Sequence, residues 1–261
     1  MKTNELINFG SLILKRNQIE THRIDAEIIL SNILKIEREI LLTKEENDIS
    51  RQDTAKFKNL IIKRIQNEPI AYILKKKEFW SEHFFVDKNS LIPRPETELL
   101  IEPIIKIFKN KNLMFLDVGV GTGCISLSIL KSLNRSRGIG IDICKKTLKN
   151  AKKNCEKFAY NNRLRLEKKT IDQIRSKMFD LIISNPPYVL SRDLNRLSDD
   201  IKKFEPKLAL DGGNDGLDVI KKIIYKSRYI LKLNGILALE IGQGQYVSVS
   251  RLLNRNNFRE K

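Results

Sequence analysis

The sequence predicts an α/β protein in which a small N-terminal helical bundle precedes a doubly wound, mostly parallel sheet. Residues 1–75 carry apolar side chains at helical spacing and show no strand pattern. From residue 113 onward, short β-branched runs alternate with amphipathic stretches, which is typical of a parallel sheet covered on both faces. A glycine-rich turn, residues 119–123, joins the first run to the first amphipathic stretch, where such folds bind ligands.

The N-terminal part is expected to contain three helices. Their apolar periodicity places them at residues 3–16, 21–35 and 51–68. Thr3 and Thr21 suit the N-cap positions of the first two. The third stops before Pro69, which cannot continue a helix.

A hairpin and an alternating α/β segment are expected next. Aromatic and β-branched pieces at 78–80 and 84–86 predict the hairpin, and a helical pattern resumes from residue 97. Strands are expected at 113–118, 138–143, 163–167, 179–184 and 236–241, and helices at 124–133, 145–158 and 216–231. We therefore divide the chain into a helical domain (1–75), a hairpin with a connecting helix (76–110) and a sheet domain (111–261).

Composition narrows the class of protein. No apolar run approaches the roughly eighteen residues of a membrane span, and the N-terminus lacks a signal-peptide core, so we expect a soluble cytoplasmic protein without a membrane partner. Three cysteines without CxxC spacing and only two histidines predict no disulfide frame and no metal site. The net charge is +2 in residues 1–90 and +15 in the remainder, which indicates either an acidic macromolecular partner or a biased composition.

The glycine turn "LDVGVGTGC" (116–124) has the regular spacing D-x-G-x-G-x-G. The dinucleotide fingerprint G-x-G-x-x-G would need a glycine where Cys124 stands, so a Rossmann dehydrogenase is the poorer match. The spacing resembles the first motif of class I S-adenosylmethionine-dependent methyltransferases, with a plain structural turn as the simpler alternative. The resemblance implies S-adenosylmethionine contacts from Gly119, Val120, Gly121, Thr122, Gly123, Asp142 and Asn185, with Asp142 accepting bonds from the ribose hydroxyls.

The turn "SNPPYVL" (184–190) follows a buried strand and contains two prolines, which remove two backbone donors and fix two φ angles. We expect the Asn185 side-chain oxygen and the Pro186 carbonyl each to accept one N–H of a planar –NH2 group. Such acceptors also stabilise the charge that develops on the nitrogen as it is methylated. Tyr188 would wall this pocket. The tetrapeptide resembles that of enzymes that methylate adenine, cytosine or glutamine amide nitrogens.

Motifs along nearly the whole chain identify a narrower resemblance. In order, they are "RIDAEIIL", "EPIAYILKKKEFW", "IPRPETELL", "DVGVGTGC", "SNPPYV" and "FEPKLALDGGNDGLD". This series resembles the HemK/PrmC family of protein-glutamine methyltransferases, which act on the Gly-Gly-Gln loop of peptide chain release factors. The resemblance implies that Asn185, Pro186, Pro187 and Tyr188 hold the glutamine, that Asn185 and Pro186 are the catalytic pair, and that the helical domain grips the release factor.

Two stretches depart from the family pattern. The family has an acid followed by an aromatic residue after the third strand, whereas this chain has "KKTIDQI" (168–174), where Asp172 is a candidate substitute for the adenine contact. The second departure is at "LLNRNNFREK" (252–261), which stops where the family would continue into a final sheet hairpin. We therefore expect that hairpin to be missing and the strand at 236–241 to lie at an uncovered edge. Arg94 and Glu96 could form a structural ion pair or serve the site.

Three alternative functions stay open. A DNA or RNA amino-methyltransferase shares the tetrapeptide and a basic sheet domain, but the near-neutral bundle and the lack of an added recognition domain make nucleic acid an unlikely partner. A methyltransferase of a ribosomal-protein glutamine also shares the tetrapeptide. A decayed, non-catalytic module that binds release factors would suit the two departures.

Overall fold

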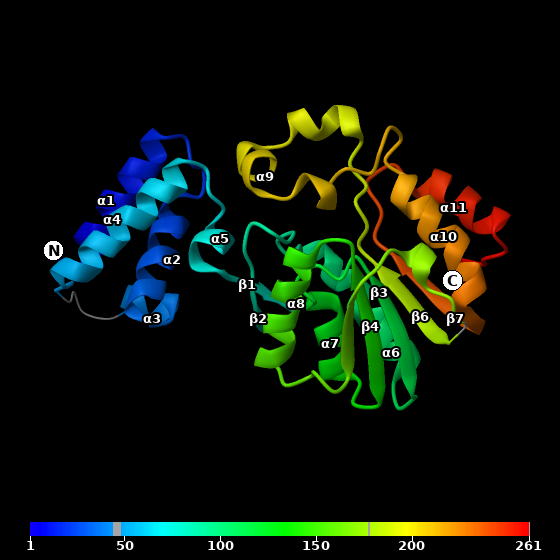
Figure 1. The fold of residues 1–261 in the computed structure, drawn as a ribbon. Coiled ribbons are helices and arrows are strands. Elements are labelled where there is room, and N and C mark those ends of the chain that lie inside the picture. Colours follow the sequence, from blue (N-terminus) through cyan, green and yellow to red (C-terminus); the bar gives the residue numbers. More distant parts are fainter. Residues whose placement is uncertain (44–47, 177, 261) are drawn as a thin grey trace. The chain divides into compact units, whose positions relative to one another are not determined.

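The computed structural model describes residues 1–43, 48–176 and 178–260, which form two compact units. The N-terminal unit consists of Met1–Lys75 together with Asp199–Phe204. The sheet unit consists of Lys76–Ser198 and Glu205–Lys261. Each unit has a hydrophobic core of its own. Figure 1 shows the helices and strands that form the units.

The N-terminal unit is built from short helices. They are α1 (Thr3–Arg16), α2 (His22–Leu34), α3 (Arg38–Thr43), α4 (Arg51–Ile65), α5 (Ile70–Leu74) and α9 (Asp199–Phe204). The three expected helices are confirmed as α1, α2 and α4, whose buried faces share a core that includes Leu6, Ile29 and Phe57. The sequence did not predict α3 or α5, because a helix of about one turn shows too few apolar repeats.

The expected cap at Thr3 is wrong, whereas Thr21 does occupy the N-cap position of α2 but makes no side-chain capping bond. Helix α1 begins at Thr3 itself, with Lys2 at the N-cap, where the Lys2 backbone N–H donates to the Glu5 carboxylate at 2.9 Å. Thr21 does precede α2, but its hydroxyl donates to Asp25 Oδ2 at 2.8 Å instead of capping the backbone. A buried carboxylate one turn away competes for the hydroxyl that local sequence assigns to the cap.

In the sheet unit the expected hairpin is confirmed. Strand β1 (Lys76–Phe79) pairs antiparallel with β2 (Glu82–Phe85). Its turn is Trp80–Ser81, one residue shorter than the sequence suggested, and both residues have positive φ angles of 51° and 56°. Two left-handed residues match the twist of the flanking strands, which is why two-residue hairpin turns adopt this geometry.

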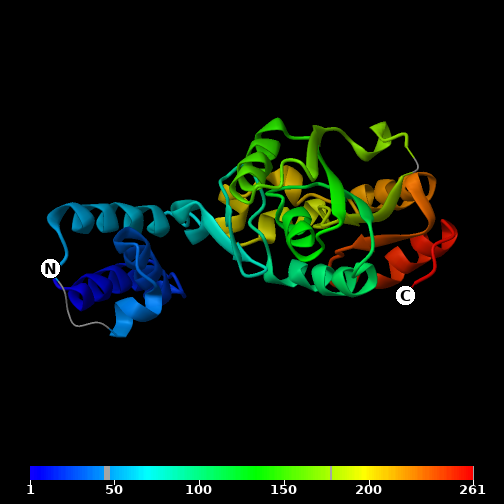
Figure 2. The ribbon, with the colours of Figure 1, turned by 90° about the horizontal axis from the view of Figure 1, so that it is seen from below.

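The main sheet has five parallel strands in the order β5-β4-β3-β6-β7. The strands are β3 (Leu113–Val118), β4 (Ser136–Asp142), β5 (Leu164–Lys168), β6 (Phe179–Ser184) and β7 (Leu231–Leu239). The helices between and after them are α6 (Ile101–Phe108), α7 (Cys124–Ser132), α8 (Lys145–Lys157), α10 (Asp218–Ile230) and α11 (Tyr246–Arg255). The predicted doubly wound sheet is thus confirmed, with helices on both faces (Figure 2).

Alternate side chains of the central strands enter different cores. Phe115 and Leu181 pack with the apolar faces of α6 and α7 on one face of the sheet. Leu116 and Ile182 pack with α10 on the other face. This two-sided burial explains why β3 and β6 are almost entirely apolar runs, as the sequence pattern required.

Strand β7 starts earlier than the expected 236–241 because its first residue, Leu231, already pairs with Phe179. The register then shifts around Asn234, whose φ is 61°, and regular pairing resumes at Ile236 opposite Leu181. As expected, β7 lies at the edge of the sheet. In the part of the chain that the structure describes, no helix is both long enough and apolar enough to cross a membrane.

Candidate functional site

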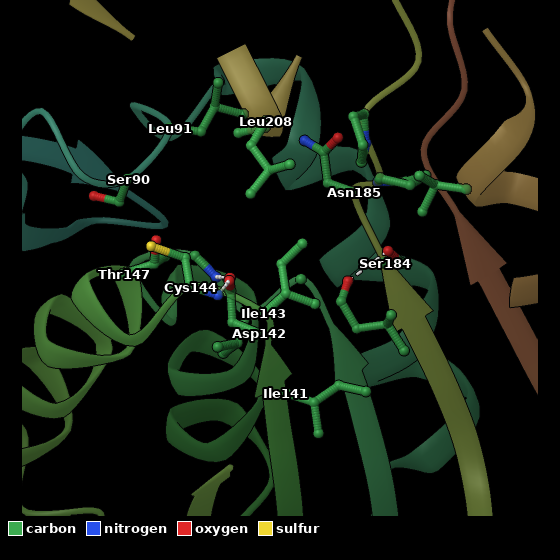
Figure 3. A pocket seen from close by; sticks show the side chains of 18 of the residues that line it. Ser90, Leu91, Ile141, Asp142, Ile143, Cys144, Thr147, Ser184, Asn185 and Leu208 are labelled. Carbon is green, nitrogen blue, oxygen red and sulfur yellow. Dashed lines mark hydrogen bonds between the residues drawn. The ribbon is translucent and has the colours of Figure 1, made fainter. Parts of the chain in front are cut away.

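A cavity of about 420 Å³ opens at the carboxyl ends of β3, β4 and β6 (Figure 3). Most of the predicted site residues line it. They are Gly119, Val120, Gly121, Thr122, Asp142, Asn185, Pro186 and Pro187. Gly123 and Tyr188 do not line it. The parallel strands bring these distant segments together because their carboxyl ends meet at one edge of the sheet.

The glycine turn shapes one wall of the cavity. Gly119 and Gly121 have φ angles of +76° and +58°, a left-handed backbone that residues with a Cβ adopt only at a cost. A Cβ built on Gly119 meets no atom within 4 Å, so the bare backbone leaves open space at this wall. Gly123 has a different task, since it precedes α7 with a φ of +82° and a Cβ there would lie 3.2 Å from Leu127 Cδ1.

Asp142, at the end of β4, is fixed by two backbone donors. Its Oδ1 accepts from the Cys144 N–H at 2.8 Å and its Oδ2 from the Gly121 N–H at 3.3 Å. Burial raises the pKa of Asp142, and these two bonds oppose the rise. Each carboxylate oxygen keeps a lone pair for a second donor, so the side chain fits a ligand that presents hydroxyl groups.

Asp117, at the end of β3, lies fully buried below the glycine turn. Its Oδ2 accepts from the Ser126 hydroxyl at 2.6 Å, whereas its Oδ1 has no hydrogen-bond partner among the described residues. Burial raises the pKa of Asp117 to about 7, the charge of Asp142 adds to the rise, and Ser126 opposes it. An unpaired buried carboxylate beside an open glycine turn fits a positively charged ligand such as the ammonium and sulfonium groups of S-adenosylmethionine.

Asn185 belongs to a hydrogen-bond chain that the sequence did not predict. Its Nδ2 donates to Thr97 Oγ1 at 2.9 Å, and the Thr97 hydroxyl donates to Glu240 Oε2 at 2.6 Å. The Tyr188 hydroxyl donates to Glu240 Oε1 at 3.2 Å. Burial, together with Glu240, raises the pKa of Tyr188 to about 12, so its hydroxyl stays a donor. Tyr188 therefore stabilises the turn through its hydrogen bond to Glu240 and does not line the cavity.

The glycine-rich loop "DGGNDG" (211–216) packs against the backbone of the Asn-Pro-Pro-Tyr turn. Val189 and residues 210–212 exchange two backbone hydrogen bonds, from Val189 N–H to the Leu210 carbonyl and from Gly212 N–H to the Val189 carbonyl. A Cβ on Gly212 would lie 2.8 Å from Tyr188 Cα, and one on Gly216 would lie 2.5 Å from the Tyr188 carbonyl oxygen. These glycines leave room for the turn, which explains why one motif accompanies the other.

Arg94 forms a structural ion pair. Its Nη2 lies 2.5 Å from Glu205 Oε1, and the second oxygen of Glu205 accepts from the Ile92 N–H at 3.1 Å. The Glu205 side chain is only 1% exposed, while Arg94 reaches the cavity wall. The pair therefore joins the "PRPETE" segment to the loop after α9.

Asp172, the candidate for the adenine contact, also lines the cavity, beside Thr170 and Ile171.

Sequence reasoning missed Thr97 and Glu240. The sequence pattern places Thr97 at the start of a helix and Glu240 within the strand expected at 236–241, and the two residues are 143 residues apart in the chain. A signal was available only for Glu240, a charged residue directly after the apolar run 236–239, because Thr97 lies between Glu96 and Glu98 in a polar stretch. Among the described residues no cluster of three possible metal ligands occurs.

The parallel sheet, the glycine turn after its central strand and the acid after the next strand define the class I S-adenosylmethionine-dependent methyltransferase fold. A methyltransferase structure from Pyrococcus furiosus superimposes with a TM-score of 0.52 at 18% identity, over 68% of this chain and 79% of that one. A SAM-dependent methyltransferase from Agrobacterium tumefaciens gives 0.50 at 15% identity, over 70% and 57%. These similarities support the fold alone.

Sequence relatives define the family. Residues 5–74 match the PrmC N-terminal domain and residues 95–201 the methyltransferase small domain. The release factor glutamine methyltransferase of Clostridium botulinum is 37% identical over 100% of this chain and 93% of its own length, and that of Clostridium acetobutylicum is 34% identical over 99% and 92%. The chain belongs to the release factor glutamine methyltransferase family, which confirms the resemblance seen in its motifs.

Proposed function

We propose that the protein transfers a methyl group from S-adenosylmethionine to the side-chain amide nitrogen of the glutamine in the Gly-Gly-Gln loop of peptide chain release factors, and so supports translation termination. The observation that carries the proposal is the cavity that Asn185 and Pro186 share with the glycine turn and Asp142. One pocket thus combines acceptors for an –NH2 group with a wall suited to a cationic cofactor. Family membership supports the choice of substrate.

Asn185 and Pro186 hold the substrate amide in this proposal. The Asn185 side-chain oxygen and the Pro186 carbonyl each accept one N–H, which turns the face of the planar nitrogen toward the methyl group. An amide nitrogen is a poor nucleophile because its lone pair is delocalised, so orientation and charge stabilisation replace a strong base. When the nitrogen forms its bond to the methyl carbon, the C–S bond would break and S-adenosylhomocysteine would leave as the neutral thioether. The two acceptors stabilise the positive charge on the nitrogen, which then loses one N–H proton to water.

The cofactor side of the cavity consists of the glycine turn and Asp142, with Asp117 buried below the turn and outside the cavity wall. S-adenosylmethionine, when bound, supplies an electrophilic methyl group on a sulfonium. Gly119 and Gly121 allow close approach of a ligand to the backbone. We propose that Asp142 accepts from the ribose hydroxyls, and the Asp117 oxygen that has no partner favours positive charge nearby. Asp172 is our candidate for the adenine contact.

The N-terminal unit would supply the second contact with the release factor. A glutamine between glycines can enter a narrow slot, but such a loop offers little else to recognise. Residues 5–74 match the PrmC N-terminal domain, which supports a docking role for this unit. We also propose a cytoplasmic location, in keeping with three free cysteines.

A methyl-transfer assay tests the proposal. The protein is incubated with methyl-labelled S-adenosylmethionine and a release factor, beside a copy of the factor whose loop glutamine is replaced by alanine. We expect label only in the factor that keeps the glutamine, and on its amide nitrogen.

Other outcomes separate the alternatives. Label in both copies, label only in added DNA or RNA, or label only in a ribosomal protein would contradict the proposed substrate. No label in any of them, with the factor still bound in a pull-down, would identify a non-catalytic binding module.

A further inference from the structure

The hydrogen-bond chain behind Asn185 has a defined direction. A carboxylate can only accept hydrogen bonds, and a threonine hydroxyl has a single hydrogen to donate. Because Glu240 Oε2 lies 2.6 Å from Thr97 Oγ1, that hydrogen is committed to Glu240. Thr97 Oγ1 can then only accept from Asn185, and the group it accepts from must be the amide Nδ2, 2.9 Å away.

This direction determines which end of the Asn185 amide is left for a ligand. Oxygen and nitrogen of an amide are assigned from the hydrogen bonds they make, and here Nδ2 is held by Thr97. The described residues donate no bond to Asn185 Oδ1, and Asn185 lines the cavity. A flipped amide would place Oδ1 against Thr97 Oγ1, and two acceptors would then face each other.

Glu240 and Thr97 are themselves held firmly. Glu240 follows β7, where its backbone N–H donates to the Ser184 carbonyl at 3.0 Å, directly before Asn185. The second carboxylate oxygen accepts from Tyr188, the last residue of the same tetrapeptide. Thr97 is only 2% exposed and its backbone N–H donates to the Arg94 carbonyl at 3.1 Å. One carboxylate therefore ties both ends of the Asn-Pro-Pro-Tyr turn.

We propose that Thr97 and Glu240 are positioning residues that fix the orientation of the Asn185 amide, so that the site presents only acceptors and selects a substrate with two N–H donors. The inference rests on the proposed function for its choice of substrate. With Oδ1 fixed toward the cavity, a glutamine –NH2 finds two acceptors, whereas a glutamate carboxylate in the same loop would meet two oxygens. The relay thus contributes to discrimination between amide and acid.

Thr97→Val and Thr97→Ser form the matched test. Valine keeps the shape of threonine without its hydroxyl, whereas serine keeps the hydroxyl. With a release factor as substrate, we expect the valine variant to lose about tenfold in kcat, the size expected of one hydrogen bond, while the cofactor dissociation constant stays within about twofold. The serine variant is expected to recover most of the loss.

A second readout needs no substrate. In protein labelled with ¹⁵N-asparagine, the Asn185 side-chain amide signal, identified by its loss in Asn185→Ala, is expected to be alike in wild type and Thr97→Ser and to shift in Thr97→Val. An unchanged signal in the valine variant would overturn the relay, as would equal kcat values for the two variants. If Thr97→Val does not fold, Glu240→Met, which removes the acceptor, is expected to shift the same signal. Absence of transfer by the wild type would contradict the proposed function, while the amide signal would still test the relay.

Discussion

The buried carboxylates of the N-terminal unit are paired with arginines, whereas Asp117, the most deeply buried carboxylate of the sheet unit, is not. In the N-terminal unit Asp25 and Glu27 are 5% and 3% exposed, and both are paired with arginines: Asp25 Oδ2 lies 2.6 Å from Arg64 Nε, and Glu27 lies between Arg23 and Arg38. In the sheet unit Asp117 is 0% exposed and no cation pairs with it among the described residues. The paired carboxylates, which include Glu205 with Arg94 in the sheet unit, serve the fold, whereas Asp117 keeps one oxygen without a partner below the glycine turn.

The pKa directions reflect the same contrast. Burial alone would raise the pKa of Glu27, but Arg23 and Arg38 reverse the effect and the pKa is lowered. Burial and Asp142 raise the pKa of Asp117 to about 7. The free-energy cost of burying a carboxylate without a cation beside it is typical of functional sites, where a bound ligand can offset it.

The largest expected effect comes from breaking the pairing in the bundle. Arg64→Ala leaves Asp25 buried without its cation, and we expect a loss of about 3–5 kcal/mol in the free energy of unfolding of the N-terminal unit. Denaturant unfolding measures it. The control is Lys56→Ala on the same helix, because Lys56 forms an exposed pair with Asp53 at 2.9 Å and should change stability by less than about 1 kcal/mol. Equal losses in the two variants would contradict the contrast.

Asp117→Asn sharpens the comparison through pH. Because the folded-state pKa of about 7 lies above the ordinary 3.8, the folded protein binds the extra proton and its stability falls as the pH rises through this window. Asparagine cannot ionise, so the variant does not lose this stability. As the pH rises from about 4 to about 8, the free energy of unfolding of the variant should therefore increase relative to that of the wild type by up to about 4 kcal/mol. If the free energy of unfolding depends on pH in the same way in the variant and the wild type, ionisation of Asp117 does not destabilise the folded protein.

Asn185→Ala tests the site without breaking the fold. We expect at least about a hundredfold lower methyl transfer, the scale of losing one preorganised stabilising group, with the melting temperature nearly unchanged. Asn161→Ala, at an exposed position of the same unit, should keep wild-type turnover. Near-normal turnover of Asn185→Ala would rule out its role as acceptor.

The smallest effect is a difference in thiol reactivity. Cys144 lines the cavity and its pKa is lowered, chiefly by the Thr147 hydroxyl, whereas burial raises the pKa of Cys124 to about 12 and of Cys155 to about 11. Iodoacetamide at mildly alkaline pH should therefore label Cys144 first. Saturating S-adenosylmethionine should slow this reaction several-fold, as mass spectrometry can follow. Unchanged labelling would argue against cofactor binding in this cavity.

Local sequence patterns predicted the fold more completely than the site. Strand β3 was predicted to the residue and β6 likewise, because buried parallel strands are apolar throughout and are bounded by glycine or proline turns. Helix α9 and the early start of β7 were missed, since one lies in a stretch of mixed polarity and the other contains an irregular Asn234.

The residues around Asn185 show why the site was harder. The turn itself was visible in the sequence, and the structure places Asn185 in the expected cavity. The orientation of its amide depends on Thr97 and Glu240. Thr97 lies 88 residues before Asn185 in the chain, and Glu240 lies 143 residues after Thr97. Periodicity reports which face of an element is buried, but it does not report which polar residues of two distant elements meet.

The strand order has a consequence for folding. The glycine turn follows β3 and Asp142 ends β4, and these two strands are consecutive in the chain. Asn185 and Glu240 follow β6 and β7. Strand β6 is the neighbour of β3 in the sheet, although β4 and β5 separate the two strands in the chain. Local contacts form early and non-local ones late, because loop closure costs entropy. During synthesis the part of the cavity formed by the glycine turn and Asp142 can therefore assemble before the part formed by Asn185 has left the ribosome.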